Sequence, residues 1–153
     1  MNINFDFSDN VTKENYEPMF FHFLNETLNE LGFEGEDIFV SLSIIDDKMM
    51  HELNRTYRGV DKTTDVLSFA FEEGDDKIVG MRELGEIYIS YQTALKQSPQ
   101  YHMTCEEEMC FLFVHGILHL CGYDHDEEEK KKIMFSLQEK IYKGADEKWK
   151  KQN

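Results

Sequence analysis

The stretch HGILHLCGYDH at residues 115–125 places three imidazole side chains where one metal ion could bind all of them. His115 and His119 are four residues apart, so on a helix they project from the same face. Gly122 suits the left-handed conformation that ends a helix, and a turn there would bring His125 to the other two. Three His ligands without a fourth protein ligand are typical of a catalytic zinc site, in which water takes the open position.

The same spacing also shows what this candidate site lacks. Zinc peptidases of the His-Glu-x-x-His type carry a general-base Glu directly after the first ligand, and a longer form adds a Gly and a third His. Position 116 is Gly here. The stretch therefore resembles a zincin metal helix without the residue that deprotonates water for peptide hydrolysis. Hydrolysis remains chemically feasible, because a bound metal ion itself lowers the pKa of water.

Two further blocks accompany this stretch, and together the three resemble the signature of the YbeY family of bacterial rRNA maturation factors. The stretch HGILHLCGYDH is similar to the family pattern His-Gly-x-Leu-His-Leu-x-Gly-Tyr-Asp-His. The other matching blocks are NRTYRG at 54–59 with TDVLSF at 64–69, and LGEIYIS at 84–90. The blocks stand in family order, and the resemblance covers essentially the whole chain.

This resemblance implies a zinc-dependent, single-strand-specific endoribonuclease that acts in 3′-end maturation of small-subunit rRNA and in ribosome quality control. His115, His119 and His125 would bind one Zn²⁺ or a related divalent transition metal, and metal-bound water or hydroxide would be the nucleophile. His115 and Arg58 would be catalytic. The implied partners are rRNA, ribosomal particles and proteins of the small subunit.

Arg58 is the basic residue that we expect to act on the substrate. In the loop before a predicted strand, it could face the metal, hold a phosphate bidentately and stabilise charge developing on it. A lone Arg on a loop is more often a solvated surface charge, so its role rests largely on the resemblance. Asp65 and Ser68 are expected to shape the site without an assigned step. Asp124 fits equally well a residue that orients an imidazole and an exposed turn.

The net charge restricts how RNA could bind. With 16 basic and 31 acidic residues the formal charge is −15, which repels nucleic acid at long range and argues against a general RNA-binding surface. RNA would have to reach a local positive spot formed by the metal, Arg55, Arg58 and Lys62. Binding would be weak and salt-sensitive unless a ribosomal partner presents the substrate. The acidic runs are interpreted as solvated faces, at 72–73, 75–76 and 127–129.

Length and composition fit one globular domain over residues 1–153, since 41% of the residues are hydrophobic and 12 are Phe. The N-terminus lacks signal-peptide features, and the longest apolar run, at 109–114, is far too short to span a membrane. We therefore expect a cytoplasmic protein without membrane contact. The three Cys form no Cys-x-x-Cys pair and are expected to be reduced thiols.

Hydrophobic periodicity predicts an α+β domain in which a mixed four-stranded sheet packs with about five helices. The predicted strands lie around residues 3–7, 40–44, 66–71 and 87–89. The predicted helices cover 16–31, from 46 or 47 to 57, about 91–97, from 106 through the first two metal ligands, and from near 126 onward. The starts of the last two helices are assigned from acidic residues, because negative charge suits the positive end of the helix dipole.

Two other classes of function stay open at this point. A metallopeptidase would share the ligands but lacks the Glu at position 116, and cleavage of casein against cleavage of structured RNA would distinguish it. A non-catalytic ribosome assembly factor with a structural metal would be distinguished by whether metal-site variants still bind pre-ribosomal particles.

Overall fold

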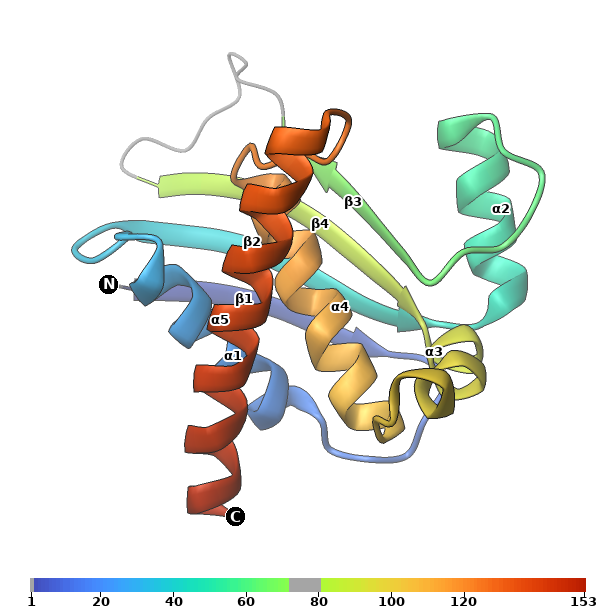
Figure 1. Cartoon of the computed structure of the whole chain (residues 1–153). Helices are drawn as coiled ribbons and strands as arrows, with labels where there is room; N and C mark the ends of the chain where they lie inside the picture. Colours follow the sequence, from blue (N-terminus) through green and yellow to red (C-terminus); the bar gives the residue numbers. More distant parts are fainter. Residues whose placement is uncertain (1, 72–80) are drawn as a thin grey trace.

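The computed structural model describes residues 2–71 and 81–153, and the acidic runs at 72–73 and 75–76 lie outside them. The elements follow the chain as shown in Figure 1. They are β1 (Asn2–Asp9), α1 (Glu17–Glu30), β2 (Asp37–Ile45), α2 (Asp47–Arg58), β3 (Val66–Ala70), β4 (Met81–Ser90), α3 (Tyr91–Gln97), the short 3-10 helix η1 (Ser98–Tyr101), α4 (Cys105–Leu120) and α5 (Glu128–Gln152). The predicted α+β class, with four strands and five α-helices, is confirmed for the described residues.

The four strands form one mixed sheet in the order β1-β2-β4-β3. β1, β2 and β4 run parallel, and β3 pairs antiparallel with β4 at one edge. In β2 the buried side chains alternate along the strand, as expected when one face of a sheet packs on a core. They are Ile38, Val40, Leu42 and Ile44.

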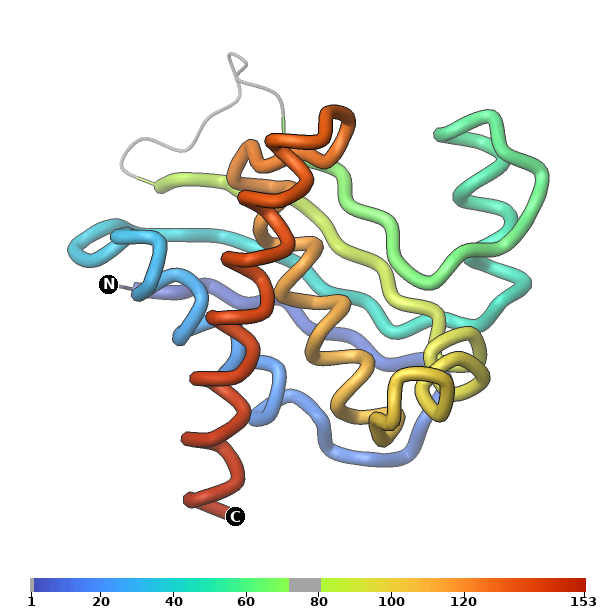
Figure 2. Tube along the Cα trace, viewed as in Figure 1, coloured from blue at the N-terminus to red at the C-terminus, as the bar shows by residue number. Residues whose placement is uncertain are grey.

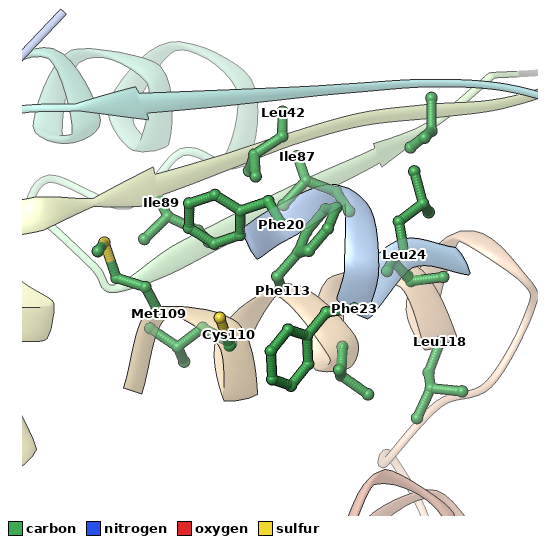
Figure 3. Packing of buried hydrophobic residues seen from close by; sticks show 14 of the residues in the cluster. Phe20, Phe23, Leu24, Leu42, Ile87, Ile89, Met109, Cys110, Phe113 and Leu118 are labelled. Atoms are coloured by element: carbon green, nitrogen blue, oxygen red, sulfur yellow. The ribbon is translucent and has the colours of Figure 1, made fainter. Parts of the chain in front are cut away.

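Helices α1, α4 and α5 gather on one face of this sheet, whereas α2 stands apart from them, as Figures 1 and 2 show. The main core lies between the sheet and these three helices, where Phe20 of α1 meets Phe113 of α4 edge to face at 5.5 Å between ring centroids (Figure 3). A smaller core lies on the other face of the sheet and joins α2 to β2 and β3. It consists of Ile45, Met50 and Leu67. The sheet is thereby held on both faces.

Side-chain caps define where two helices important for the site begin. Thr104 and Glu107 form a reciprocal capping box at the start of α4, which places its first residue one position before the predicted start at 106. Asp46 caps α2 by accepting the backbone N–H of Met49 at 2.8 Å, which decides between Asp46 and Asp47, the two caps that the sequence allowed. These caps fix the positions from which α2 and α4 present their side chains.

The described part of the chain holds no disulfide and no candidate membrane span. Cys105 and Cys110 are buried free thiols, and Cys121 is a half-buried one. Among residues 2–71 and 81–153, no helix combines the length and the apolar composition that crossing a membrane requires.

Gly85 allows the end of α4 to approach the sheet closely. Its φ is +148°, and a Cβ there would lie 2.2 Å from the carbonyl oxygen of Phe69 and 2.8 Å from Cδ2 of Leu120. We expect Gly85→Ala to lower the free energy of unfolding by roughly 2–5 kcal/mol, because backbone strain and crowding add up. Urea denaturation measures the loss. Gly35→Ala is the control, since Gly35 has a φ of +83° and open space around it. Equal losses in both variants would contradict the crowding.

Candidate metal centre

Helix α4 and the turn that ends it bring the three His together. His115 and His119 lie one turn apart on α4, and the helix ends in a Schellman motif. In this motif the Tyr123 N–H donates to the Leu118 carbonyl and the Gly122 N–H to the His119 carbonyl, both at 3.0 Å. Gly122 adopts a φ of +96°, which a side chain would strain. The chain therefore turns back and returns His125 toward the helix.

The three imidazoles have the spacing that a single metal ion needs. One nitrogen from each of His115, His119 and His125 lies within 4.8 Å of the others. The Nε2 atoms of His115 and His119 are 3.1 Å apart. Nitrogens bound to zinc at about 2.0–2.1 Å in tetrahedral geometry lie roughly 3.3 Å from one another. The His115–His119 pair thus already has the spacing that a small divalent transition metal needs, and the His125 nitrogen lies within 4.8 Å of both.

The protonation states of two of these rings also suit metal binding. His115 Nδ1 lies 2.9 Å from Oε1 of Gln138, and because that oxygen only accepts, Nδ1 carries the proton and Nε2 keeps its lone pair. Burial lowers the pKa of His115. Burial and the neighbouring imidazoles lower the pKa of His119. Both rings are therefore predominantly neutral at pH 7, as ligands must be.

Two residues of α5 support the cluster, and the sequence reasoning missed both. Gln138 is 1% exposed and donates its Nε2 to the carbonyl of Phe111 at 3.3 Å, which fixes the amide that holds His115. Phe135 stacks on His115 and His125 with ring centroids 6.0 and 6.1 Å away. Their three-residue spacing on one helix face was a visible signal, but nothing in the sequence directs that face toward the metal helix.

Gly116 has a structural reason to be glycine. A Cβ at this position would lie 3.0 Å from Oγ of Ser68 and 3.1 Å from two side-chain carbons of Ile87. The position therefore faces side chains of β3 and β4 at close contact, and any larger residue would need Ser68 and Ile87 to shift by a few tenths of an ångström. Position 116, where a zincin carries its general base, is therefore a packing position in this protein.

Arg58 shares a cavity with the three His. This cavity has a volume of about 570 Å³, and its walls come from β3, α4, the turn after α4 and the end of α2. Arg58 is the last residue of α2, so the prediction that it lies on a loop is wrong. The helix ends there because Gly59 takes a left-handed φ of +70°. The guanidinium donates from Nη2 to the Ser68 carbonyl at 2.5 Å and lies 4.7 Å from the ring centroid of Phe69.

The other predicted site residues fall in different places. Asp65 and Ser68 line the cavity with the three His. The Asp65 carboxylate accepts the Val66 N–H at 2.7 Å and Nε2 of Gln97 at 3.0 Å, so it orders the start of β3. Asp124 is exposed, and its Oδ1 accepts the backbone N–H of His125 at 2.7 Å. Its carboxylate thus contacts the backbone of a candidate ligand, and an orienting role toward an imidazole stays a prediction.

Arg55 and Lys62 do not line this cavity. Arg55 is exposed on α2, and its Nη2 lies 3.8 Å from Oε1 of Glu52. Lys62 is exposed in the segment before β3, where its carbonyl accepts from the amide of Asn54 at 2.9 Å. Of the three basic residues predicted to form a positive spot, Arg58 is the one that the fold brings to the cluster.

Together, the mixed sheet, the metal helix and the three converging imidazoles define an α+β protein with a three-His site that opens into a cavity. Comparison with known proteins agrees with this class. The family model described as "Endoribonuclease YbeY" matches residues 2–146, and the chain belongs to the YbeY family. The resemblance inferred from the three sequence blocks is confirmed.

Individual relatives cover most of the chain. "Endoribonuclease YbeY" of Heliobacterium modesticaldum is 41% identical over 94% of this chain and 96% of its own length. The protein of the same name from Clostridioides difficile is 49% identical over 72% of this chain and 75% of its own length. The solution structure of TM1509 from Thermotoga maritima matches 97% of this chain and 93% of that one, with a TM-score of 0.63 and 30% identity.

Proposed function

We propose that this protein is a zinc-dependent, single-strand-specific endoribonuclease that acts in 3′-end maturation of small-subunit rRNA and in ribosome quality control. The observation that carries the proposal is the convergence of Arg58 and three imidazoles on one cavity. The name endoribonuclease, which its relatives bear, supports the reaction class.

The site residues would have two roles. The three His would hold a metal ion, and Arg58 would position a phosphate. A bound Zn²⁺ would act as a Lewis acid and lower the pKa of water at its open position. His115, His119 and His125 would hold it through neutral nitrogens. Arg58 donates one N–H to the Ser68 carbonyl. A guanidinium has five such donors, so enough remain to bind two non-bridging oxygens of a phosphodiester and stabilise the charge that develops on them.

The charge distribution supports a partner that delivers the RNA. The formal charge of −15 disfavours RNA approach at long range, and Arg58 is the basic side chain that lines the described cavity. We infer that rRNA within ribosomal particles, together with protein partners on the small subunit, presents a single strand to the site. This places the activity in the cytoplasm, where those particles are assembled.

RNA cleavage without peptide cleavage tests this function. We expect metal-dependent cleavage of single-stranded rRNA fragments and background turnover of casein. Since a positioned base contributes roughly 10²–10⁴ in rate and Gly116 supplies none, a peptidase at this site should be slower than a zincin by about that factor. The measurement is product formation from both substrates at equal enzyme concentration, with and without a chelator, and with duplex RNA as the control. Robust chelator-sensitive casein turnover would instead favour a metallopeptidase.

A non-catalytic assembly factor with a structural metal is expected to behave differently. In that case the zinc-loaded protein would bind pre-ribosomal particles but leave the RNA intact under every metal condition. Binding that survives in the His variants, together with cleavage that does not, would support the nuclease.

A further inference from the structure

A second cavity adjoins the metal cavity and shares a wall with it. Asp65, Val66 and His115 line both. The second cavity has a volume of about 350 Å³, at the lower end of the range of roughly 300–1,000 Å³ found for small-molecule sites. A ligand there would lie directly beside a phosphate bound at the three imidazoles.

Glu108 is the unusual residue of this second cavity. It is 2% exposed, and its Oε2 has no hydrogen-bond partner among the described residues. Burial, with the nearby Asp65 carboxylate, raises the pKa of Glu108 to about 7. Leaving a buried carboxyl oxygen unpaired costs stability, so such a group calls for a function. Neither metal binding by the three His nor phosphate binding by Arg58 uses it.

Glu108 lies on the face of α4 that leads to the metal centre. It is seven residues, or about two helical turns, before His115, and Phe111 and Leu112 between them also line the cavity. The Glu108 carboxyl and the candidate metal ligand His115 therefore belong to the same wall of the cavity, which α4 forms.

The remaining walls are rich in aromatic side chains. Phe111 is half-buried, whereas Tyr101 is 61% and Phe135 39% exposed, so both of these rings can be reached from solvent. Exposed aromatic rings beside a single-strand path are the usual platform on which RNA bases stack. Beside these rings the lining includes the carboxyls of Glu108 and Asp65, which disfavour a phosphate, and polar groups of Gln97, His115 and Gln138, a combination suited to a nucleobase.

We propose that this cavity receives the guanine base next to the scissile phosphate, with Glu108 accepting from its N1–H and N2–H. This proposal rests on the proposed ribonuclease function and deepens it. Among the four RNA bases, guanine alone presents two adjacent N–H donors on its Watson–Crick edge. Adenine and cytosine place a ring acceptor beside the amino group, and uracil has one donor between two carbonyls, so the ionised carboxylate would meet lone pairs there.

Binding of nucleoside 5′-monophosphates to the zinc-loaded full chain tests the proposal, at about pH 8 so that the Glu108 carboxyl is mainly ionised. All four share the ribose and phosphate, so differences in calorimetric Kd report on the base. We expect GMP to bind roughly tenfold to a hundredfold more tightly than AMP, CMP and UMP, as one bidentate base contact allows. IMP lacks the N2 amino group and should fall between them. Equal Kd values for the four would overturn the proposal.

Two variants locate the contact. Glu108→Gln should raise the Kd for GMP to that of the other nucleotides, whereas Glu139→Gln, which removes the same charge from the exposed face of α5, should leave it unchanged. Tyr101→Ala should weaken all four nucleotides several-fold, because stacking does not depend on base identity. Tyr101→Ala still tests whether the base binds in this cavity if Glu108→Gln fails to fold, which a thermal melt would reveal.

The outcomes separate this inference from the function on which it rests. GMP preference that persists in Glu108→Gln would place base recognition elsewhere and overturn the inference alone. A GMP preference that depends on Glu108, in a protein that cleaves no RNA under any metal condition, would instead overturn the nuclease and leave the base site standing.

Discussion

Arg58→Ala should lower the rate of RNA cleavage by about a hundred- to a thousandfold, the loss typical of one electrostatic donor that acts on transition-state charge. Arg58 is exposed, and its contacts are one hydrogen bond to the Ser68 carbonyl and the ring of Phe69. Removing these costs little stability, so zinc content and thermal unfolding should stay close to those of the unchanged protein. Single-turnover cleavage of a single-stranded rRNA fragment measures the effect.

Arg58→Lys should recover only part of the lost rate. A lysine supplies the charge, but its point-like ammonium cannot hold the Ser68 carbonyl and two phosphate oxygens in one plane as a guanidinium can. The size of the recovery therefore separates charge from geometry.

Arg55→Ala is the matched control for Arg58→Ala. Arg55 lies one helical turn earlier on α2, carries the same charge and is near Glu52, but it does not line the cavity. Its loss should reduce cleavage modestly, and the reduction should shrink as salt screens a distant charge. Equal losses at positions 55 and 58, or full cleavage by Arg58→Ala, would show that α2 supplies diffuse positive potential and that the phosphate clamp is absent.

Local patterns in the sequence predicted the fold well because each one corresponds to a local physical preference. Alternating or continuous apolar residues predicted the strands, and an acidic cap at Asp46 or Asp47 predicted the start of α2. The end of α2 was placed one residue early, at Tyr57, which put Arg58 on a loop. Gly59 is as compatible with a loop as with a helix C-cap, so only the backbone conformation decides between them.

The candidate ligands were predictable because helix and turn geometry alone bring them together. Gln138 and Phe135 were not, because α5 meets α4 through packing of distant segments that no local pattern encodes. Gly116 was recognised as the absence of a Glu, but its close contact with Ser68 and Ile87 comes from β3 and β4, which no local pattern relates to this helix position. Tertiary contacts of this kind explain most of what the sequence reasoning could not reach.

His119→Ala should abolish both zinc binding and RNA cleavage. His119 stands between the other two candidate ligands, with its Nε2 3.1 Å from that of His115 and its ring centroid 5.1 Å from that of His125. Two His and water rarely hold zinc against dialysis, since zinc sites of the catalytic kind keep three protein ligands. Elemental analysis after dialysis should fall from about one equivalent to near zero.

The matched control is His51→Ala, which removes an imidazole that lies outside the three-His cluster. His51 is exposed on α2, and its Nε2 lies 2.7 Å from Oδ1 of Asp61, so His51→Ala should leave zinc content and cleavage unchanged. The half-buried ring of His119 makes a change in stability the competing explanation, and a thermal melt without zinc resolves it. If metal loss is the cause, the unchanged protein stripped of zinc should cleave as poorly as His119→Ala and regain activity on adding zinc, whereas the variant should not. Near-stoichiometric zinc persisting in single Ala variants of His115, His119 and His125 would show that the metal binds elsewhere.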